Sequence, residues 1–248
     1  MDHKVIGTTM PVLEMQLAAG ESIVAQGGEL SWMTGPIQLE TAASGKAGAK
    51  GMFGAVKRAV AGGSLFMTEY TAEGGPGMVA FATKVPGQIL PIEVSAEKSY
   101  MVHRGGYLCG LPGVNLEIGF QQKFSAGLFG GAGFILQKVS GDGPAWIELD
   151  GEVVTYDLVA GQEIVVHPGH VGMFEAGMAF ELERIKGIKN VLFGADALFL
   201  AKLTGPGTVW LQTLPLPNLA AALAPYLPTA DGDGNSGKGF SLNLGGDD

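Results

Sequence analysis

Two stretches of this chain repeat each other without a gap. Residues 128–149 read LFGGAGFILQKVSGDGPAWIEL and residues 192–213 read LFGADALFLAKLTGPGTVWLQT. They share eight identities in twenty-two positions, and Trp146 stands opposite Trp210. A fainter copy at 62–81, GGSLFMTEYTAEGGPGMVAF, has Met78 at the tryptophan position. Such a repeat strongly constrains the architecture, because each copy folds as the same unit and packs against its neighbours.

A second repeated element alternates with the first. It contains Gly followed by Glu or Gln and continues into β-branched and aliphatic residues, at 17–33, 84–101 and 158–174. The alternation predicts one folded domain over residues 1–227, with three repeats at about 17–83, 84–150 and 158–214. We expect the three units to pack around a pseudo-threefold axis.

The hydrophobic pattern within the copies has the period of a β-strand. Ala145 and Ile147 fall on one face, and Trp146 and Glu148 fall on the other. Glycine-rich turns such as residues 141–144 separate the short strands. We therefore predict an all-β fold, which could be a sandwich, a barrel or a double-stranded β-helix.

Three segments depart from this strand pattern. Residues 51–61 have apolar residues at helical spacing and predict a short helical insertion. Residues 214–227 predict a short helix bounded by prolines, with Asn218 near its start as the cap. The Gly- and Asp-rich residues 228–248 are expected to form a flexible tail.

Composition limits the classes of function. The formal net charge of −9 argues against DNA or RNA binding, which depends on Lys and Arg at phosphates. The single Cys109 excludes an intrachain disulfide and suits a reducing compartment. The N-terminal sequence lacks the apolar core of a signal peptide, and no apolar run reaches about 20 residues. We therefore expect a cytoplasmic protein.

The string GGSLF at 62–66, the string LAKLTGPGTVWLQ at 200–212 and the Gly-Glu or Gly-Gln units resemble one family. It is the altered-inheritance-of-mitochondria (number twenty-four), or mitochondrial biogenesis, family, and the resemblance covers roughly residues 5–225. It implies a fold like that of the tryptophan RNA-binding attenuation protein (TRAP), and no catalytic residues are implied. Eukaryotic members are linked to the organisation of the mitochondrial inner membrane. Asp2 and Glu14 stand where a mitochondrial presequence would have Arg and Ser, so we do not extend that location to this chain.

One group of residues has the types that bind a metal. His167, His170 and Glu175 lie near the spacing of the cupin metal motif, which also occurs in double-stranded β-helices. Cupin histidines are two residues apart, so that both point from one strand face. Here they are three apart and enclose Pro168-Gly169, which indicates a turn. Solvent-facing turn histidines are therefore the competing interpretation.

Candidate interaction residues come from two places in the sequence. Trp146 and Trp210 alternate away from the aliphatic strand face, so they either belong to the core or present an apolar surface to a partner. In the helical insertion, apolar residues lie beside two cations and could touch a partner or a membrane surface; these residues are Met52, Phe53, Lys57 and Arg58.

We expect a non-catalytic assembly or interaction protein, and a homo-oligomer, in an envelope- or stress-associated complex. Sheet edges that need covering favour assembly. Two alternatives stay open: a cupin-like metal-dependent enzyme, and a small-ligand or RNA-binding module. We expect protein partners and no cofactor. We do not expect DNA binding, and the negative net charge disfavours RNA binding. Any contact with a membrane is expected to be peripheral.

Overall fold

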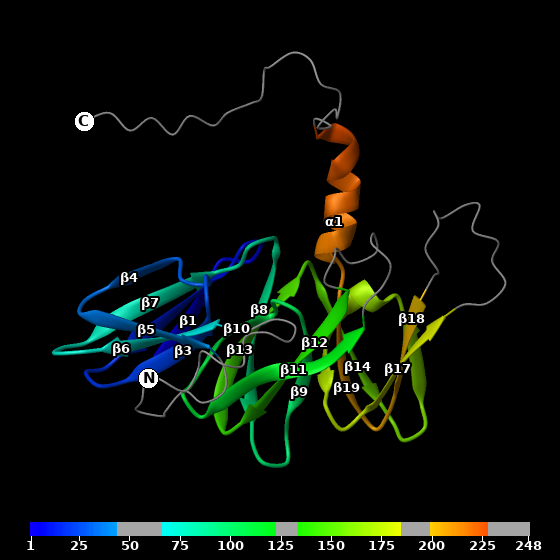
Figure 1. Cartoon of the computed structure of the whole chain (residues 1–248), viewed down its shortest axis with the longest axis horizontal. Coiled ribbons are helices and arrows are strands. Elements are labelled where there is room, and N and C mark those ends of the chain that lie inside the picture. Colours follow the sequence, from blue (N-terminus) through cyan, green and yellow to red (C-terminus); the bar gives the residue numbers. More distant parts are fainter. Residues whose placement is uncertain (44–65, 123–132, 185–198, 228–248) are drawn as a thin grey trace.

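The computed structural model describes residues 1–43, 66–122, 133–184 and 199–227. These residues form four antiparallel sheets that follow one another along the molecule (Figure 1). The first sheet has the strand order β1 (Asp2–Ile6), β2 (Val12–Leu17), β7 (Gly77–Ala82), β4 (Trp32–Thr34). The fourth sheet has the order β15 (Glu163–Val166), β18 (Phe199–Thr204), β17 (Ala179–Arg184).

The two middle sheets have six strands each. The second sheet has the order β5 (Ile37–Ala43), β6 (Phe66–Ala72), β3 (Ser22–Gln26), β10 (Tyr107–Gly110), β13 (Gly143–Asp150), β8 (Gly87–Val94). The third has the order β11 (Val114–Gln122), β12 (Phe134–Gly141), β9 (Tyr100–His103), β16 (Val171–Glu175), β19 (Gly207–Gln212), β14 (Val153–Leu158). Each of these sheets consists of two groups of three strands. The groups meet at the centre of the sheet, where β3 pairs with β10 in the second sheet and β9 pairs with β16 in the third.

Three hydrophobic cores lie between successive sheets. Each core draws on the two sheets that flank it, with Phe81 and Trp146 in the first, Ile147 and Val102 in the second, and Phe174 and Leu203 in the third. Because Trp146 and Ile147 are neighbours on β13, the second sheet has a core on each face, and residues 145–150 are all buried. The strand alternation read from the sequence is therefore present, with apolar packing on both sides.

The all-β prediction is confirmed. The hairpin from β12 to β13 turns where Gly141 and Gly143 have φ of 105° and 110°, a region that side chains disfavour. The three-repeat arrangement, its threefold axis and the TRAP-like detail stay predictions. The helical insertion at 51–61 and the tail at 228–248 lie outside the described residues.

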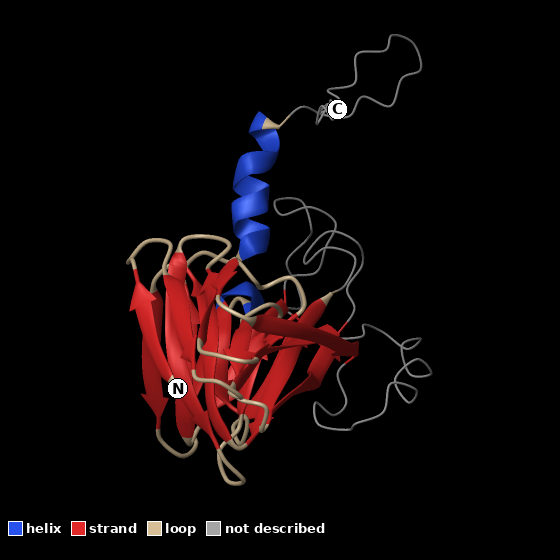
Figure 2. Cartoon of the chain, turned by 90° about the vertical axis from the view of Figure 1, so that its left-hand side faces the viewer, coloured by secondary structure: helices blue, strands red, loops and turns tan. Residues whose placement is uncertain are grey.

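One α-helix follows the last strand. The helix α1 spans Leu216–Leu223 and stands away from the sheets in Figures 1 and 2, and a 3₁₀ turn, η3 (Ala224–Tyr226), extends it. The prediction that Asn218 caps this helix is wrong, because Pro215 occupies the cap and the Asn218 backbone N–H bonds to the Pro215 carbonyl. Pro217 fits the first turn, where no N–H is needed, so the helix starts earlier. Among the described residues, no helix is long and apolar enough to cross a membrane.

Candidate functional site

The two candidate metal-binding histidines lie together. His167 precedes the 3₁₀ turn η2 (Pro168–His170), and its ring centroid is 5.9 Å from that of His170. Burial, followed by the neighbouring His170, lowers the pKa of His167. Glu175 ends the strand β16 that follows the turn, where its Oε1 is 4.0 Å from Lys98 Nζ. Within the described ranges, no three His, Cys, Asp or Glu side chains are grouped closely enough to hold a metal.

Instead, the histidine turn is bonded to the strand that leads to α1. His170 Nδ1 donates to the Gln212 carbonyl oxygen at 2.8 Å, and Gln212 Nε2 donates to the Gly169 carbonyl at 3.0 Å. On its other side, His170 Nε2 is 3.5 Å from Asn218 Nδ2. Gln212 is buried, and its Oε1 also accepts from the Asp150 backbone N–H at 3.0 Å. This glutamine was missed in the sequence, where it looks like an ordinary strand polar residue.

The two repeat tryptophans point inward. Trp146 is 3% exposed in the first core, and its ring meets His3 edge-on at 5.0 Å. Trp210 is half-buried against the second core, with its ring 5.9 Å from Tyr100. Both side chains therefore contribute to packing between sheets. The other candidate interaction residues, Met52, Phe53, Lys57 and Arg58, lie outside the described residues.

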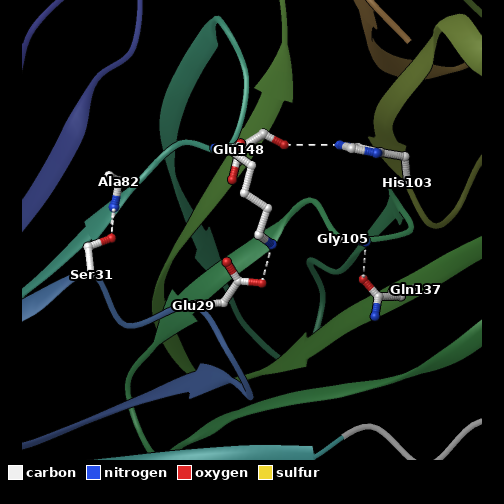
Figure 3. A network of polar contacts seen from close by, with 8 residues as sticks. Glu29, Ser31, Ala82, His103, Gly105, Gln137 and Glu148 are labelled. Atoms are coloured by element: carbon white, nitrogen blue, oxygen red, sulfur yellow. Dashed lines mark hydrogen bonds and ion pairs between the residues drawn. The ribbon is translucent and has the colours of Figure 1, made fainter. Parts of the chain in front are cut away.

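A group of ionisable side chains connects the segments that follow β3 and β7 with β9 and β13 of the middle sheets; its carboxylates Glu29 and Glu148 are buried and its Lys84 is exposed. Glu148, 3% exposed on β13, accepts at Oε1 from the Lys84 backbone N–H at 2.9 Å. The Lys84 Nζ forms an ion pair with the buried Glu29 at 2.5 Å. His103 Nε2 donates to the Glu148 carbonyl oxygen at 3.0 Å, and Figure 3 shows Glu148 between His103 and Glu29. Lys84 thus supports two carboxylates, one through its backbone and one through its side chain.

Burial dominates the electrostatics of this group. It raises the pKa of Glu148 to about 7, with the Lys84 backbone N–H acting in the opposite direction. The second Glu148 carboxylate oxygen is enclosed and has no hydrogen-bond partner in the described part of the chain. Burial also raises the pKa of Glu29 and Asp150 and lowers that of His103. Burial therefore favours the uncharged form of each of these four groups.

Exposed apolar side chains occur on several elements, and two sets of them bear on interaction. The first lies on α1 and the turn after it, namely Leu216, Leu223, Tyr226 and Leu227, which we call the α1 surface. The second lies on two edge strands: Trp32 and Met33 on β4 are 45% and 40% exposed, and Val165 on β15 is 56% exposed. Large exposed apolar groups that cluster on one element mark interaction sites more often than scattered ones do.

Comparison with known proteins gives three matches. A family model described as mitochondrial biogenesis AIM24 matches residues 3–214. An uncharacterised protein of Streptococcus pyogenes serotype M6 is 28% identical over 225 residues, which cover 89% of this chain and 88% of the relative. The X-ray crystal structure of a Streptococcus pyogenes protein matches with a TM-score of 0.71 and 22% identity, over 91% of this chain and 99% of that one. The match to the crystal structure is a likeness of fold, and neither relative's description names an activity.

Proposed function

This chain belongs to the mitochondrial biogenesis AIM24 family, and from that premise we propose that it is a non-catalytic assembly protein that binds a protein partner through α1. The family resemblance read from the sequence is confirmed by the match over residues 3–214. Family membership supplies no reaction, so the proposal rests on the surface of this chain.

The observation that carries the proposal is the apolar, uncovered helix. Residues 216–227 read LPNLAAALAPYL and contain no charged side chain, yet no residue of α1 is buried. Tyr226 is 85% exposed and Leu227 62% exposed. A helix without a polar face is normally buried, since exposing such side chains forgoes the gain from removing apolar area from water.

A protein with an apolar groove fits this surface better than a lipid bilayer does. Helices that lie on membranes carry Lys and Arg on their polar face to meet anionic headgroups. Residues 216–227 have neither, and the chain has a formal net charge of −9. Helix-in-groove binding uses apolar side chains three to four residues apart, and Leu216, Leu219 and Leu223 have that spacing.

The proposal extends to the setting expected from the sequence, an envelope- or stress-associated complex in the cytoplasm. The single cysteine, which is free and buried, is compatible with a reducing compartment. The identity of a partner captured through α1 would test this setting directly.

The test compares two double variants of the full chain. Leu223→Lys/Tyr226→Lys places two charges on the α1 surface, and Val154→Lys/Val159→Lys places the same charges on exposed positions elsewhere, which are 42% and 70% exposed in the unsubstituted protein. A partner captured stoichiometrically with the unsubstituted protein is purified, and its affinity for all three proteins is measured. We expect the α1 variant to bind on the order of tenfold more weakly or worse, and the control to bind normally.

Equal affinity of the two variants would overturn the proposal, because charge on α1 would then have no specific effect. So would sedimentation with phosphatidylcholine–phosphatidylglycerol vesicles that the α1 substitutions abolish, since the occupant would then be a membrane. Far-ultraviolet circular dichroism on each variant establishes that the fold is retained.

A further inference from the structure

The chain joins its own units twice in the same way. At the first junction, β10 pairs antiparallel with β3, with Cys109 opposite Ala25. At the second, β16 pairs antiparallel with β9, with Met173 opposite Val102. All four of these residues are completely buried. Each junction turns three strands of one unit and three of the next into one continuous sheet.

One of the two strands needed for a third junction of this kind lies near the start of the chain. Cys109 is opposite Trp146 on β13, and Met173 is opposite Trp210 on β19. Met78 holds the tryptophan position in the fainter repeat, and the residue opposite Met78 is Thr34 on β4. The strand β4 therefore corresponds to β10 and β16. In the described part of the chain it pairs only with β7, and Thr34 is exposed.

The other strand needed for such a junction lies near the end of the chain. Val102 lies opposite Gln137, and Val166 on β15 lies opposite Ala201. Gln137 and Ala201 occupy the same position in the ungapped repeat, so Val166 corresponds to Val102. The first junction agrees, because Ala25 follows Gly20-Glu21 at the same distance as Val166 follows Gly161-Gln162. Among the described strands, β15 pairs only with β18.

We propose that β4 of one copy pairs antiparallel with β15 of a second copy, with Thr34 opposite Val166. The two open edges are complementary halves of a contact that the chain already makes twice internally. Figure 1 shows the first and fourth sheets at opposite ends of the molecule with the middle sheets between them, so the two edges of one chain do not meet. The contact joins the fourth sheet of one copy to the first sheet of the next, and in this register the exposed Val165 lies opposite Gly35 and the exposed Met33 lies opposite His167.

This contact is head-to-tail, because different surfaces of the two copies meet. Such contacts produce a closed ring or an open filament, according to the rotation between copies. The pairing also removes two exposed strand edges, which otherwise template unwanted association. The inference goes beyond the proposed function, since it uses none of the residues of the α1 surface.

The register makes the proposal testable with single cysteines. One protein carries Thr34→Cys and a second, differently tagged protein carries Val166→Cys. Directly opposite residues in an antiparallel pair have Cα atoms about 4.5–5.5 Å apart, a spacing that a disulfide spans. The native Cys109 is buried, and burial raises the pKa of its thiol, so it stays unreactive.

After mild oxidation of an equal mixture, we expect a disulfide-linked dimer that contains both tags. The register control pairs the Thr34→Cys protein with an Ile164→Cys protein, in which the thiols are diagonal at about 7–8 Å. We expect at least tenfold less product there. Light scattering of the unsubstituted full chain is expected to give a mass of several chains, and Val165→Lys is expected to reduce it to that of one chain.

Three outcomes would overturn the proposal. The first is a single-chain mass for the unsubstituted protein at every concentration tested. The second is a larger mass without the mixed disulfide, which would place the contact elsewhere. The third is a disulfide within one chain of a Thr34→Cys/Val166→Cys double variant, which would mean that the edges close on themselves. Loss of partner binding by the α1 variant leaves all three readouts unaffected.

Discussion

His103 Nε2 donates a hydrogen bond to the carbonyl oxygen of Glu148, 3.0 Å away, and so fixes its ring against the strand that carries two buried carboxylates. The two residues come from different sheets, since His103 ends β9 and Glu148 lies on β13. Titration of His103 therefore acts on the packing between the second and third sheets, whereas the carboxyl group of Glu148 lies on the other face of β13, beside Lys84.

Glu148→Gln is expected to remove a pH-dependent loss of stability. Because the folded-state pKa of Glu148 is about 7 against an ordinary 4.5, the folded protein holds this proton more tightly than the unfolded chain. The resulting stability is complete below pH 4.5 and is lost as the pH rises through 7, by about 3 kcal/mol. Urea unfolding from pH 4.5 to 8 measures this difference between the variant and the unsubstituted protein.

His103 acts in the opposite direction, because its lowered pKa adds stability as the pH rises toward 6.5. It is present in both proteins, so the comparison isolates Glu148. Glu93→Gln, an exposed change on the neighbouring β8, is the control and is expected to follow the unsubstituted protein. Parallel pH curves for Glu148→Gln and the unsubstituted protein would contradict the prediction.

The two repeat tryptophans are expected to differ in their contribution to stability. Trp146→Ala empties a site in the first core and should cost about 3–5 kcal/mol in the free energy of unfolding. Trp210→Ala should cost less, because Trp210 is only half-buried. Denaturant unfolding of both variants gives the two values, and a larger loss for Trp210→Ala would refute this ranking.

Gln212→Leu is expected to destabilise the fold by about 1–3 kcal/mol. It removes the acceptor for the Asp150 backbone N–H and the donor to the Gly169 carbonyl, and leaves buried polar groups unpaired. Gln121→Leu, an exposed change on β11, should stay within about 0.5 kcal/mol of the unsubstituted protein. Equal melting temperatures of the two variants would show that these hydrogen bonds make no net contribution to the stability of the fold.

Zinc is expected to have the same effect on the unsubstituted protein and on His167→Ala. His167 and His170 lie together, but Glu175 is at the far end of β16, and within the described residues no third His, Cys, Asp or Glu is grouped with the two histidines. Thermal unfolding with zinc and with a chelator measures this. A stabilisation by zinc that His167→Ala abolishes would contradict this expectation and support the metal site predicted from the sequence.

The sequence predicts the all-β class because strand alternation and glycine turns are local properties. The alternation around Trp146 correctly separates two faces of β13, but it does not show that both are covered. Glu148 shares the face of Trp146, so its burial could have been anticipated once that face was assigned to the core. The pairing with Lys84 and His103 could not, because it depends on contacts between strands far apart in the chain.

The start of α1 was predicted wrongly because cap preference favoured Asn218 over a position flanked by prolines. The edges of β4 and β15 that are unpaired in the described part of the chain also could not be predicted from the sequence. A repeat predicts equivalent strands, but which copies lack a partner emerges only from the order of the sheets. The metal site at His167, His170 and Glu175 stays a prediction, because spacing along the chain does not fix the distance between side chains across a strand.

The complete burial of residues 145–150, with a core on each face of the second sheet, also bears on motion. No partial opening exposes β13 while leaving its neighbours intact, because both adjoining layers rest on it. Its amide protons should therefore exchange with solvent only when the whole chain unfolds, later than those of β4 or α1. The second sheet of such a protein therefore unfolds only together with the sheets on both sides of it, whereas β4 and α1 can open locally.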